Sequence, residues 1–287
     1  MSLRTPNKIR TLQRKLYAKA KQEPAFRFYA LYDKVHRADI LSHAYDLVRA
    51  NRGAPGIDGV TCKALEAGSG KAAYLGQLQE ELERKTYCAD GVRRVWIPKP
   101  DGSERPLGIP TIRDRIVQMA LKLVVEPIFE ADFCEHSYGF RPKRSAHDAV
   151  DAVADALLKR HTRVIDADLS KYFDTIPHAK LMAVVAERIV DGAVLGLIQQ
   201  WLKAPVIEED EKGKRRPQGG KGNRKGTPQG GVMTPPTMLQ KRARFRIPHR
   251  VLHAKYHVNA FAVDFDSFHQ CSDEFAAAGP VESLEAC

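Results

Sequence analysis

The chain has 287 residues, with 46 lysines and arginines against 35 aspartates and glutamates, a net charge of +11 and a pI of about 9.4. This length is enough for one large domain or two smaller ones. The positive charge favours a polyanionic partner, nucleic acid first and an anionic membrane second, and it is equally compatible with a soluble basic protein that has no such partner.

Other classes of protein are excluded by the pattern of residues. No apolar run reaches the ~18 residues that a membrane-spanning helix needs, and the first residues lack the apolar core of a signal peptide. The five cysteines have no CxxC spacing, so neither a disulfide framework nor a zinc site is indicated. We therefore expect a cytoplasmic protein in a reducing environment, without a membrane partner.

Apolar periodicity and the positions of glycine and proline predict a mixture of helices and strands. Helices are expected at residues 8–22, 24–50, 74–84, 114–130, 146–160, 179–190 and 193–204. Two strands joined by a tight turn at Pro100-Asp101-Gly102 are expected within residues 92–111, and another strand at 162–169. Residues 211–226, rich in Gly, Lys and Arg, are expected to form a loop. Because the helices outnumber the strands and do not alternate regularly with them, the expected fold class is α+β.

The strand at residues 162–169 carries a pair of aspartates that need a compensating partner. Side chains alternate along a strand, so Asp166 and Asp168 share one face. Carboxylates on one face raise each other's pKa unless a cation or a hydrogen-bond donor compensates. Mg²⁺ is one such cation, since it binds one or two carboxylates together with substrate phosphates. From this stretch alone, solvated or arginine-paired acids at a strand end are the simpler interpretation.

Longer motifs elsewhere in the chain change that interpretation. They are "NRGAPGIDGVT" at residues 51–61, "WIPKPDGSERPLGIPTIRDRIVQ" at 96–118, "SYGFRP" at 137–142, "DADLSKYFDTI" at 166–176 and "GTPQGG" at 226–231. Together, in this order, they closely resemble the reverse transcriptases encoded by bacterial and organellar group II introns, which also serve as maturases. The resemblance covers the chain from about residue 40 to Pro235. It implies the fingers and palm of a right-hand polymerase.

The resemblance implies a role for each residue that matches a family motif. Asp168 matches the aspartate that bridges two Mg²⁺ ions, and the backbone carbonyl of Leu169 matches a second oxygen ligand. Two metal ions activate the primer 3′-hydroxyl and stabilise the leaving pyrophosphate. Phe173 matches the aromatic gate that excludes a ribose 2′-hydroxyl, whereas without the resemblance it would be interpreted as a core residue.

Other matches lie in the fingers and beside the nucleotide. Lys99 and Arg105 match residues that grip the incoming triphosphate, a role that suits a point charge and a forked guanidinium, although such a pair is usually a solvated face. Gln229 matches a residue near the ribose of the nucleotide, in what would otherwise be an ordinary glycine turn. Tyr138 and Arg141 match a block near the template strand, where Arg141 could equally form a structural ion pair.

The sequence departs from the family after about Pro235. The family continues into a hairpin whose tip is Tyr-Ala-Asp-Asp, but this sequence has no adjacent Asp-Asp pair, and Asp264 and Asp266 are the nearest imitation. The thumb and maturase regions are also missing. We therefore expect a truncated form with an incomplete palm and no thumb, explained by a reading-frame change or a damaged gene copy.

Three functions are compatible with these observations. The first is an RNA-directed DNA polymerase that uses Mg²⁺, an intron RNA template, a DNA primer and deoxynucleoside triphosphates, and that is impaired by the truncation. The second is an inactive remnant that still binds intron RNA through basic surfaces, and the third is a truncated product without stable function. The expected domains are a basic helical extension at residues 1–60, the fingers and partial palm at 61–240, and a divergent, poorly ordered tail at 241–287.

Overall fold

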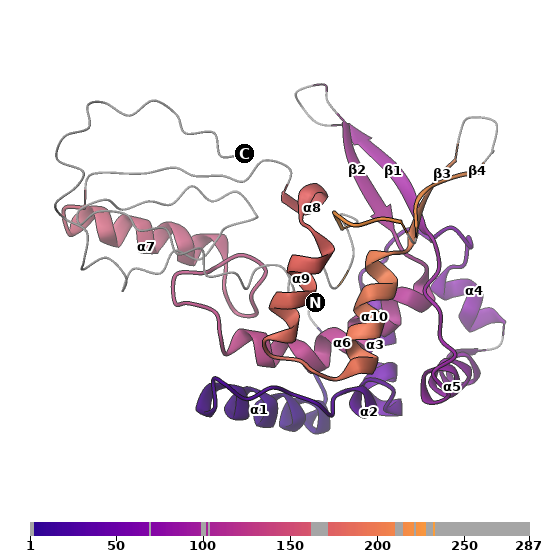
Figure 1. Ribbon diagram of the computed structural model, residues 1–287, viewed down its shortest axis with the longest axis horizontal. Coiled ribbons are helices and arrows are strands. Elements are labelled where there is room, and N and C mark those ends of the chain that lie inside the picture. Colours follow the sequence, from indigo (N-terminus) through magenta and orange to yellow (C-terminus); the bar gives the residue numbers. More distant parts are fainter. Residues whose placement is uncertain are drawn as a thin grey trace. The chain divides into compact units, whose positions relative to one another are not determined.

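The computed structural model describes residues 3–68, 70–98, 102, 104–161, 172–209, 215–220, 222–227 and 232. Helices and a small sheet follow one another without regular alternation (Figure 1), which confirms the α+β class. By their contacts the residues form two units, one made of residues 1–132 and 173–238 and the other of residues 133–172 and 239–287. The domain boundaries expected from the sequence stay a prediction.

A four-stranded sheet lies in the first unit, in the order β2-β1-β3-β4. β1 (Val92–Pro98) and β2 (Glu104–Ile109) form the antiparallel hairpin that the sequence predicts. β3 (Pro205–Glu209) runs parallel to β1 and pairs with the antiparallel strand β4 (Arg215–Gly219). The sheet therefore consists of two hairpins, far apart in the sequence, that are joined along β1 and β3.

The loop expected at residues 211–226 is wrong in part, because residues 215–219 form β4. Every residue of β4 is exposed, so the strand has no alternation of apolar and polar side chains that the sequence could reveal. Pro217 has no amide hydrogen to donate to a neighbouring strand. It is tolerated here because β4 lies at the edge of the sheet.

The central helix of the first unit is α6 (Ile112–Glu130), against which α1 (Asn7–Gln22) and α3 (Ala38–Ala50) pack. Its buried residues occur on all sides, as is typical of a helix enclosed by its neighbours. The helix begins at a cap, because the Thr111 hydroxyl accepts a hydrogen bond from the amide of Asp114. This observation confirms the helix predicted at residues 114–130 and extends its start.

A proline inside α6 explains one contact between α6 and α1. Pro127 has no amide hydrogen, so it cannot donate to the carbonyl of Leu123, one helical turn earlier. The Gln13 side chain of α1 donates to that carbonyl instead, at 3.0 Å. A backbone group that the helix leaves unsatisfied thus becomes an attachment point for α1, whose predicted range of residues 8–22 is confirmed.

The helix expected at residues 24–50 is wrong in its first part. The chain is not helical between residues 23 and 31, and the helices there are the short α2 (Tyr32–Val35) and α3. Phe28 forms a bridge with Ile189, and the Asp191 carboxylate accepts hydrogen bonds from the amides of Leu31 and Tyr32 at 2.8 and 2.9 Å. Contacts with a distant part of the chain therefore override the local helical preference.

A buried arginine holds this non-helical segment in place. Arg188 is 5% exposed, and its guanidinium donates to the carbonyls of Ala20, Pro24 and Phe26. Its Nε also lies 2.8 Å from the carboxylate of Asp132. A single side chain thus satisfies the carbonyls at the end of α1 and in the turn that follows it.

The remaining helices agree with the sequence except for two short ones. They are α4 (Cys62–Ala67), α5 (Gly70–Glu83), α7 (Ala146–Leu158), α8 (Tyr172–Thr175), α9 (His178–Ala186) and α10 (Gly192–Leu202). α4 and α8 were not expected, because helices this short display no apolar period. In the part of the chain that the structure describes, every helix is too short or too polar to cross a membrane.

We predict that Arg188→Met costs about 3 kcal/mol of unfolding free energy, because it removes the donor to the buried carbonyl of Ala20 and to two part-buried carbonyls, and also the ion pair with Asp132. Urea unfolding followed by tryptophan fluorescence measures this loss. The matched control is Arg84→Met, since Arg84 pairs with Glu80 on an exposed helix surface and should contribute about 0.5 kcal/mol. Equal losses for the two variants would contradict the structural role of Arg188.

Candidate functional site

The structure describes four of the eight site residues that the sequence predicts. Asp168, Leu169, Lys99 and Gln229 lie outside the described residues, and so does the strand expected at 162–169. Arg105 and Phe173 lie in the first unit, and Tyr138 and Arg141 in the second. The roles of all eight residues stay predictions, and the structure establishes the surroundings of the four that it describes.

Arg105 lies on β2, near the exposed end of the first hairpin. It is opposite Ile97 of β1, so the two side chains share one face of the sheet. Two residues further along each strand, Val95 and Leu107 are also opposite each other and share that face. Arg105 is therefore presented on an apolar strip that leads from the base of the hairpin toward its turn.

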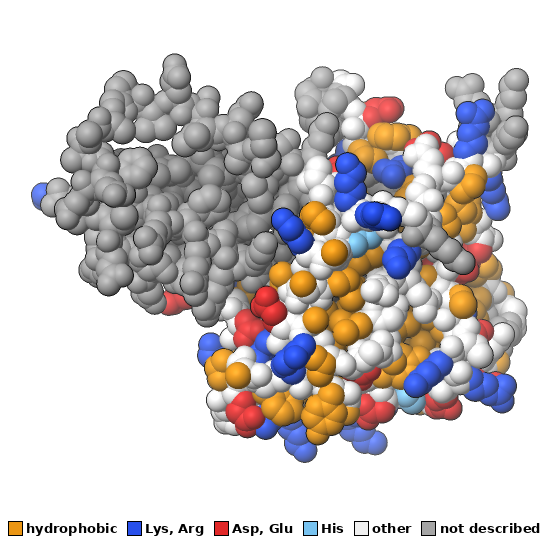
Figure 2. Space-filling view, in the orientation of Figure 1, with side chains coloured by type: hydrophobic (Ala, Val, Ile, Leu, Met, Phe, Trp, Pro, Cys, Tyr) orange, Lys and Arg blue, Asp and Glu red, His pale blue; other side chains and the backbone are white. Residues whose placement is uncertain are grey.

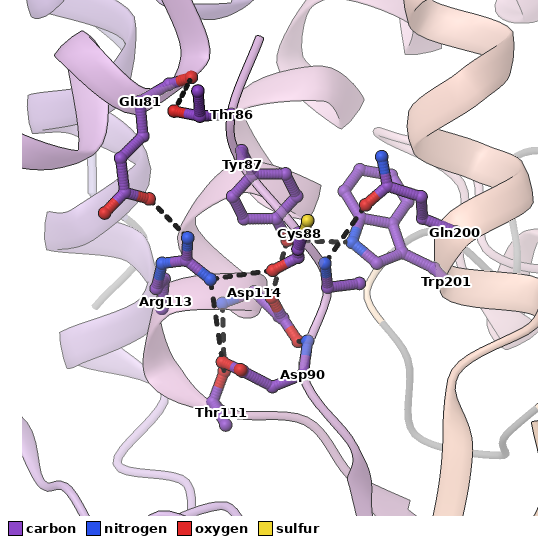
Figure 3. Close-up of polar contacts among 11 residues, drawn as sticks. Glu81, Thr86, Tyr87, Cys88, Asp90, Thr111, Arg113, Asp114, Gln200 and Trp201 are labelled. Carbon is purple, nitrogen blue, oxygen red and sulfur yellow. Dashed lines mark hydrogen bonds and ion pairs between the residues drawn. The ribbon is translucent and has the colours of Figure 1, made fainter.

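A buried polar cluster holds the base of this hairpin (Figure 3). The Tyr87 hydroxyl donates to the Asp114 carboxylate at 2.5 Å and accepts from the Trp201 indole at 3.0 Å. The amide of Asp90 donates to the other carboxylate oxygen at 3.0 Å. These contacts connect the segment before β1 with the start of α6 and the end of α10.

The same cluster reaches the end of β2 and the helix α5. The Thr111 hydroxyl donates to the Asp90 carboxylate at 3.0 Å, which joins the residues just before β1 to those just after β2. Arg113 forms a short ion pair with Glu81 of α5 and donates to the carbonyl of Cys88 at 2.8 Å (Figure 3). Both ends of the hairpin are therefore fixed to the helices around it.

Burial changes the proton affinity of two groups in the cluster. Asp114 is 1% exposed, and this burial raises the pKa of its carboxyl to about 6, although the hydrogen bond from Tyr87 acts in the opposite direction. Burial also raises the pKa of the Tyr87 hydroxyl, and the nearby Asp114 charge raises it further. Tyr87 is therefore a permanent hydrogen-bond donor to Asp114.

The segment "NRGAPG" packs against the same end of α6. A Cβ atom on Gly56 would lie 2.6 Å from the Cα of Thr111, so only glycine permits this approach of the two backbones. The Arg115 guanidinium donates to the carbonyls of Ala54 and Pro110, which fixes the loop to the end of β2. The N-terminal motif thus has a structural role beside the hairpin.

Two motifs that are far apart in the sequence meet at α8. The amide of Thr227, just before Pro228-Gln229-Gly230-Gly231, donates to the carbonyl of Phe173 at 2.7 Å. The amide of Gly226 donates to the carbonyl of Ile176 at 2.9 Å, and Pro177 forms a bridge with Lys225. The predicted aromatic gate is therefore in contact with the start of the predicted nucleotide-binding turn, and the Phe173 side chain is 9% exposed.

Gly226 and His178 make this contact possible, and neither was identified from the sequence as a site residue. Gly226 has a φ angle of +79°, and a Cβ atom there would lie 2.6 Å from the carbonyl oxygen of Asp174. The ring Nε2 of His178 lies 2.6 Å from the carbonyl oxygen of Gly226. A single histidine at a helix start has no sequence signal, whereas the glycine before "TPQGG" could have been identified as part of the motif.

The segment after the Gln-Gly-Gly turn also has a fixed neighbour. The amide of Val232 donates to the Gln118 side chain of α6 at 3.2 Å, and Gln118 is 5% exposed. α9 begins after Pro177 without a side-chain cap. The residues before the Pro228-Gln229-Gly230-Gly231 turn thus contact α8, and the residue after it contacts α6.

Tyr138 and Arg141 lie in the loop before α7, in the second unit. The Arg141 guanidinium donates to the carbonyls of Cys134 and Ser137 at 2.8 and 2.7 Å and lies 5.0 Å from the centre of the Phe133 ring. Tyr138 is 8% exposed. These contacts give Arg141 a structural role in its own loop, and the expected contact with the template stays a prediction.

Comparison with known proteins identifies the family. A family model described as reverse transcriptase (RNA-dependent DNA polymerase) matches residues 97–261, more than half of the chain. The chain belongs to the reverse transcriptase family. This membership confirms the expected fold type, the fingers and palm of a reverse transcriptase, and the match continues past Pro235 into the divergent part of the sequence.

Individual relatives identify the branch of the family. Protein YkfC of Escherichia coli is 40% identical over 79% of this chain and 58% of its own length. Group II intron-encoded protein LtrA of Lactococcus lactis is 32% identical over 72% of this chain and 33% of its own length. A putative COX1/OXI3 intron 2 protein of Saccharomyces cerevisiae is 30% identical over 67% of this chain and 21% of its own length. These relatives confirm the group II intron-encoded branch, and the chain spans less than two thirds of each of them.

A solved structure titled "Partial Cas6-RT-Cas1--Cas2 complex" matches 72% of this chain and 33% of its own length, with 20% identity and a TM-score of 0.44.

Members of the reverse transcriptase family use divalent metal ions and bind an RNA template with a primer. Among the residues that the structure describes, no group of three His, Cys, Asp or Glu side chains could hold such an ion. The predicted ligands Asp168 and Leu169 are not among the residues searched.

The raised pKa of Asp114 predicts a pH-dependent stability. Between about pH 4 and pH 6 the unfolded chain releases this proton while the folded chain keeps it, so the folded state loses about 3 kcal/mol as the pH rises, and the loss is complete above pH 6. Asp114→Asn cannot titrate. Urea unfolding at several pH values should therefore show the wild-type advantage over Asp114→Asn shrinking from pH 4 to pH 7, and a constant difference would refute the assignment.

The contact between Gly226 and α8 predicts that Gly226→Ala costs about 2 kcal/mol or more, because the new Cβ atom meets the Asp174 carbonyl and the φ angle is positive. The control is Gly196→Ala in α10, where a Cβ atom would meet nothing within 4 Å and alanine should stabilise the helix by about 0.5–1 kcal/mol. Thermal or urea unfolding of both variants measures the two effects. Losses of the same size and sign would contradict the close approach at Gly226.

Proposed function

We propose that the chain provides the fingers and part of the palm of an RNA-directed DNA polymerase of the group II intron type, working in the cytoplasm. The reaction would join deoxynucleotides to a DNA primer along an intron RNA template. The observation that supports this most directly is the hydrogen bond between Thr227 and Phe173, because it brings together two family motifs that are far apart in the sequence. The fixed base of the fingers hairpin adds to this support.

The residues of the hairpin and of α8 would hold the nucleotide. Lys99 and Arg105 would bind the oxygens of the triphosphate, which suit a point charge and a planar fork of donors. Phe173 would limit the space beside the sugar at the 2′ position, and Gln229 would contact the ribose. Phe173 is 9% exposed, so little of this residue is available for that role.

Mg²⁺ would be held by the Asp168 carboxylate and the Leu169 carbonyl, a pair of oxygen ligands that suits this hard cation. When bound, the ions supply a Lewis acid that favours loss of the primer 3′-hydroxyl proton and stabilises the departing pyrophosphate. The 287 residues contain no adjacent Asp-Asp pair to complete the site in the way that the family does. Because that part of the metal site is missing, we expect this chain by itself to have low polymerase activity.

A second function, binding of intron RNA without catalysis, is favoured by α1. The helix carries several cations and no acid, and Lys8, Arg14 and Lys15 are exposed. Ile9, Leu16 and Ala20 are buried, so the cations occupy the surface that the core does not use. In Figure 2, Lys and Arg side chains lie along the lower edge of the view, where α1 and α2 run, together with Asp, Glu and hydrophobic side chains. Such a surface would bind RNA phosphates without sequence preference.

The test is primer extension on an RNA template with deoxynucleoside triphosphates and Mg²⁺. We predict that Asp168→Ala lowers extension by more than about 100-fold, as expected when a group that stabilises the transition state is removed. Asp151→Ala is the matched control, because Asp151 is an exposed acid in α7 and its loss should leave extension unchanged.

Binding of RNA by the same samples separates the two functions. If Asp168→Ala extends primers as well as the wild type, the polymerase proposal fails. If neither protein extends primers, and both bind RNA with an affinity that falls steeply with salt and does not need Mg²⁺, the second function replaces the first.

A further inference from the structure

α6 carries two buried polar side chains among apolar ones. The structure describes every residue of this helix, and Asp114 and Gln118 are the only polar side chains among its buried residues, at 1% and 5% exposure. They are four residues apart in the sequence, so they lie on the same side of the helix. A buried polar group lowers the stability of a protein unless it is hydrogen-bonded, so each of the two needs a partner.

Asp114 and the cap residue Thr111 hold the fingers hairpin on this side of α6 (Figure 3). The amide of Asp90 donates to the Asp114 carboxylate at 3.0 Å, and the Thr111 hydroxyl donates to the Asp90 carboxylate, also at 3.0 Å. Asp90 lies two residues before β1, and Thr111 lies two residues after β2. The start of α6 therefore fixes both ends of the hairpin that carries Arg105.

Gln118 holds a second segment, the residue that follows the Pro228-Gln229-Gly230-Gly231 turn. Its side-chain oxygen accepts a hydrogen bond from the amide of Val232 at 3.2 Å. Before the turn, the amide of Thr227 donates to the carbonyl of Phe173 at 2.7 Å, and Thr227 is 7% exposed. The four residues between Thr227 and Val232 are therefore attached at both ends, to α8 before the turn and to α6 after it.

The composition of the turn makes this attachment important. Gly230 and Gly231 are adjacent, and glycine loses more conformational freedom on ordering than any other residue. Hydrogen bonds at both ends of so short a segment restrict its conformations before a nucleotide binds, and such pre-organisation increases affinity. Packing alone does not require an acceptor at position 118, because neighbouring buried side chains of α6, such as Val117 and Leu121, are apolar.

We propose that Gln118 is a positioning residue for nucleotide binding, which acts by holding the amide of Val232 and with it the Gln229 turn. Because Asp114 holds the fingers hairpin on the same side of α6, one helix then sets the spacing between Arg105, which would bind the triphosphate, and Gln229, which would contact the ribose. The proposal rests on the proposed function and extends it to a residue that prepares the site through its neighbours.

Hydrogen exchange of the Val232 amide, followed by NMR, tests the contact in the protein without nucleotide. Gln118→Met keeps the approximate volume of the side chain and removes the acceptor, whereas Gln118→Glu keeps an acceptor oxygen at the same place. We expect this amide to exchange about 5- to 10-fold faster in Gln118→Met than in the wild type, the effect of losing one hydrogen bond, and at nearly the wild-type rate in Gln118→Glu. Equal rates in the wild type and in Gln118→Met would overturn the proposal.

Primer extension on an RNA template tests the effect on the nucleotide. We expect Gln118→Met to raise KM for deoxynucleoside triphosphates about 5- to 10-fold and to change kcat less than about 2-fold, because a contact with the ribose is present before and in the transition state alike. Gln118→Glu should restore most of the affinity. Gln13→Met is the matched control, since it also removes a hydrogen bond between a glutamine side chain and a backbone group, and its KM should equal that of the wild type.

A purely structural role of Gln118 would change the two kinetic constants differently. It would lower the amount of folded protein, and with it the apparent kcat, while KM stayed unchanged. That result, equal KM values for Gln118→Met and Gln13→Met, or a raised KM that Gln118→Glu does not restore would overturn the positioning role and leave the polymerase proposal intact. If the wild type does not extend primers, the polymerase proposal fails, and the positioning role fails with it.

Discussion

The buried carboxyl of Asp114 is the constraint on which the arrangement of the first unit depends. A carboxyl group that is 1% exposed has lost its water, so it must find donors within the protein. Tyr87 and the amide of Asp90 supply them, and Trp201 in turn donates to Tyr87. These hydrogen bonds form only when three parts of the chain lie together: the segment before β1, the start of α6 and the end of α10. This requirement fixes the base of the fingers hairpin.

The same requirement explains how distant parts of the chain are attached to the helices of the core. Pro127 leaves the carbonyl of Leu123 without its helical donor, and the Gln13 side chain of α1 supplies one. At the other end of α1, Arg188 donates to carbonyls that the helix leaves unsatisfied. The exposed cations of α1 owe their position to these contacts, because the helix can direct them to solvent only while its other face is held against α6.

The sequence predicts the elements that carry strong patterns and misses those that depend on distant partners. The first hairpin and α6 follow from a turn motif and from a long apolar helix, and both are confirmed. β4 is entirely exposed and shows no alternation, so nothing local distinguishes it from a loop. The sequence predicts a helix that includes residues 24–31. In the structure, however, the side chains of Asp191 and Arg188 form hydrogen bonds with backbone groups of this segment. Helix propensity depends on neighbouring residues in the sequence, so it cannot predict such long-range contacts.

The candidate site shows the same division between motif and environment. Arg105 and Phe173 can be identified from family motifs, because their roles are tied to a fixed order of residues. His178 belongs to no such motif, although its ring forms a hydrogen bond with the carbonyl oxygen of Gly226, the residue that contacts α8. The buried cluster around Asp114 could not be predicted either, since Asp114 at a helix start is usually an exposed residue that interacts with the helix dipole. Only the packing of α10 against the segment before β1 gives it a different role.

The two faces of the fingers hairpin depend on the buried cluster at its base. In a strand, a shift of one residue exchanges the two faces, so the register decides whether Trp96 or Ile97 lies beside Arg105. Among the described residues, β1 pairs with β3 at Val92 and Arg93, at the end of the strand next to Asp90. Asp90 is bound both to Asp114 and to Thr111, on either side of the hairpin. A carboxyl group buried far from the exposed turn therefore determines which side chains the turn offers to a nucleotide and which it offers to the opposite surface.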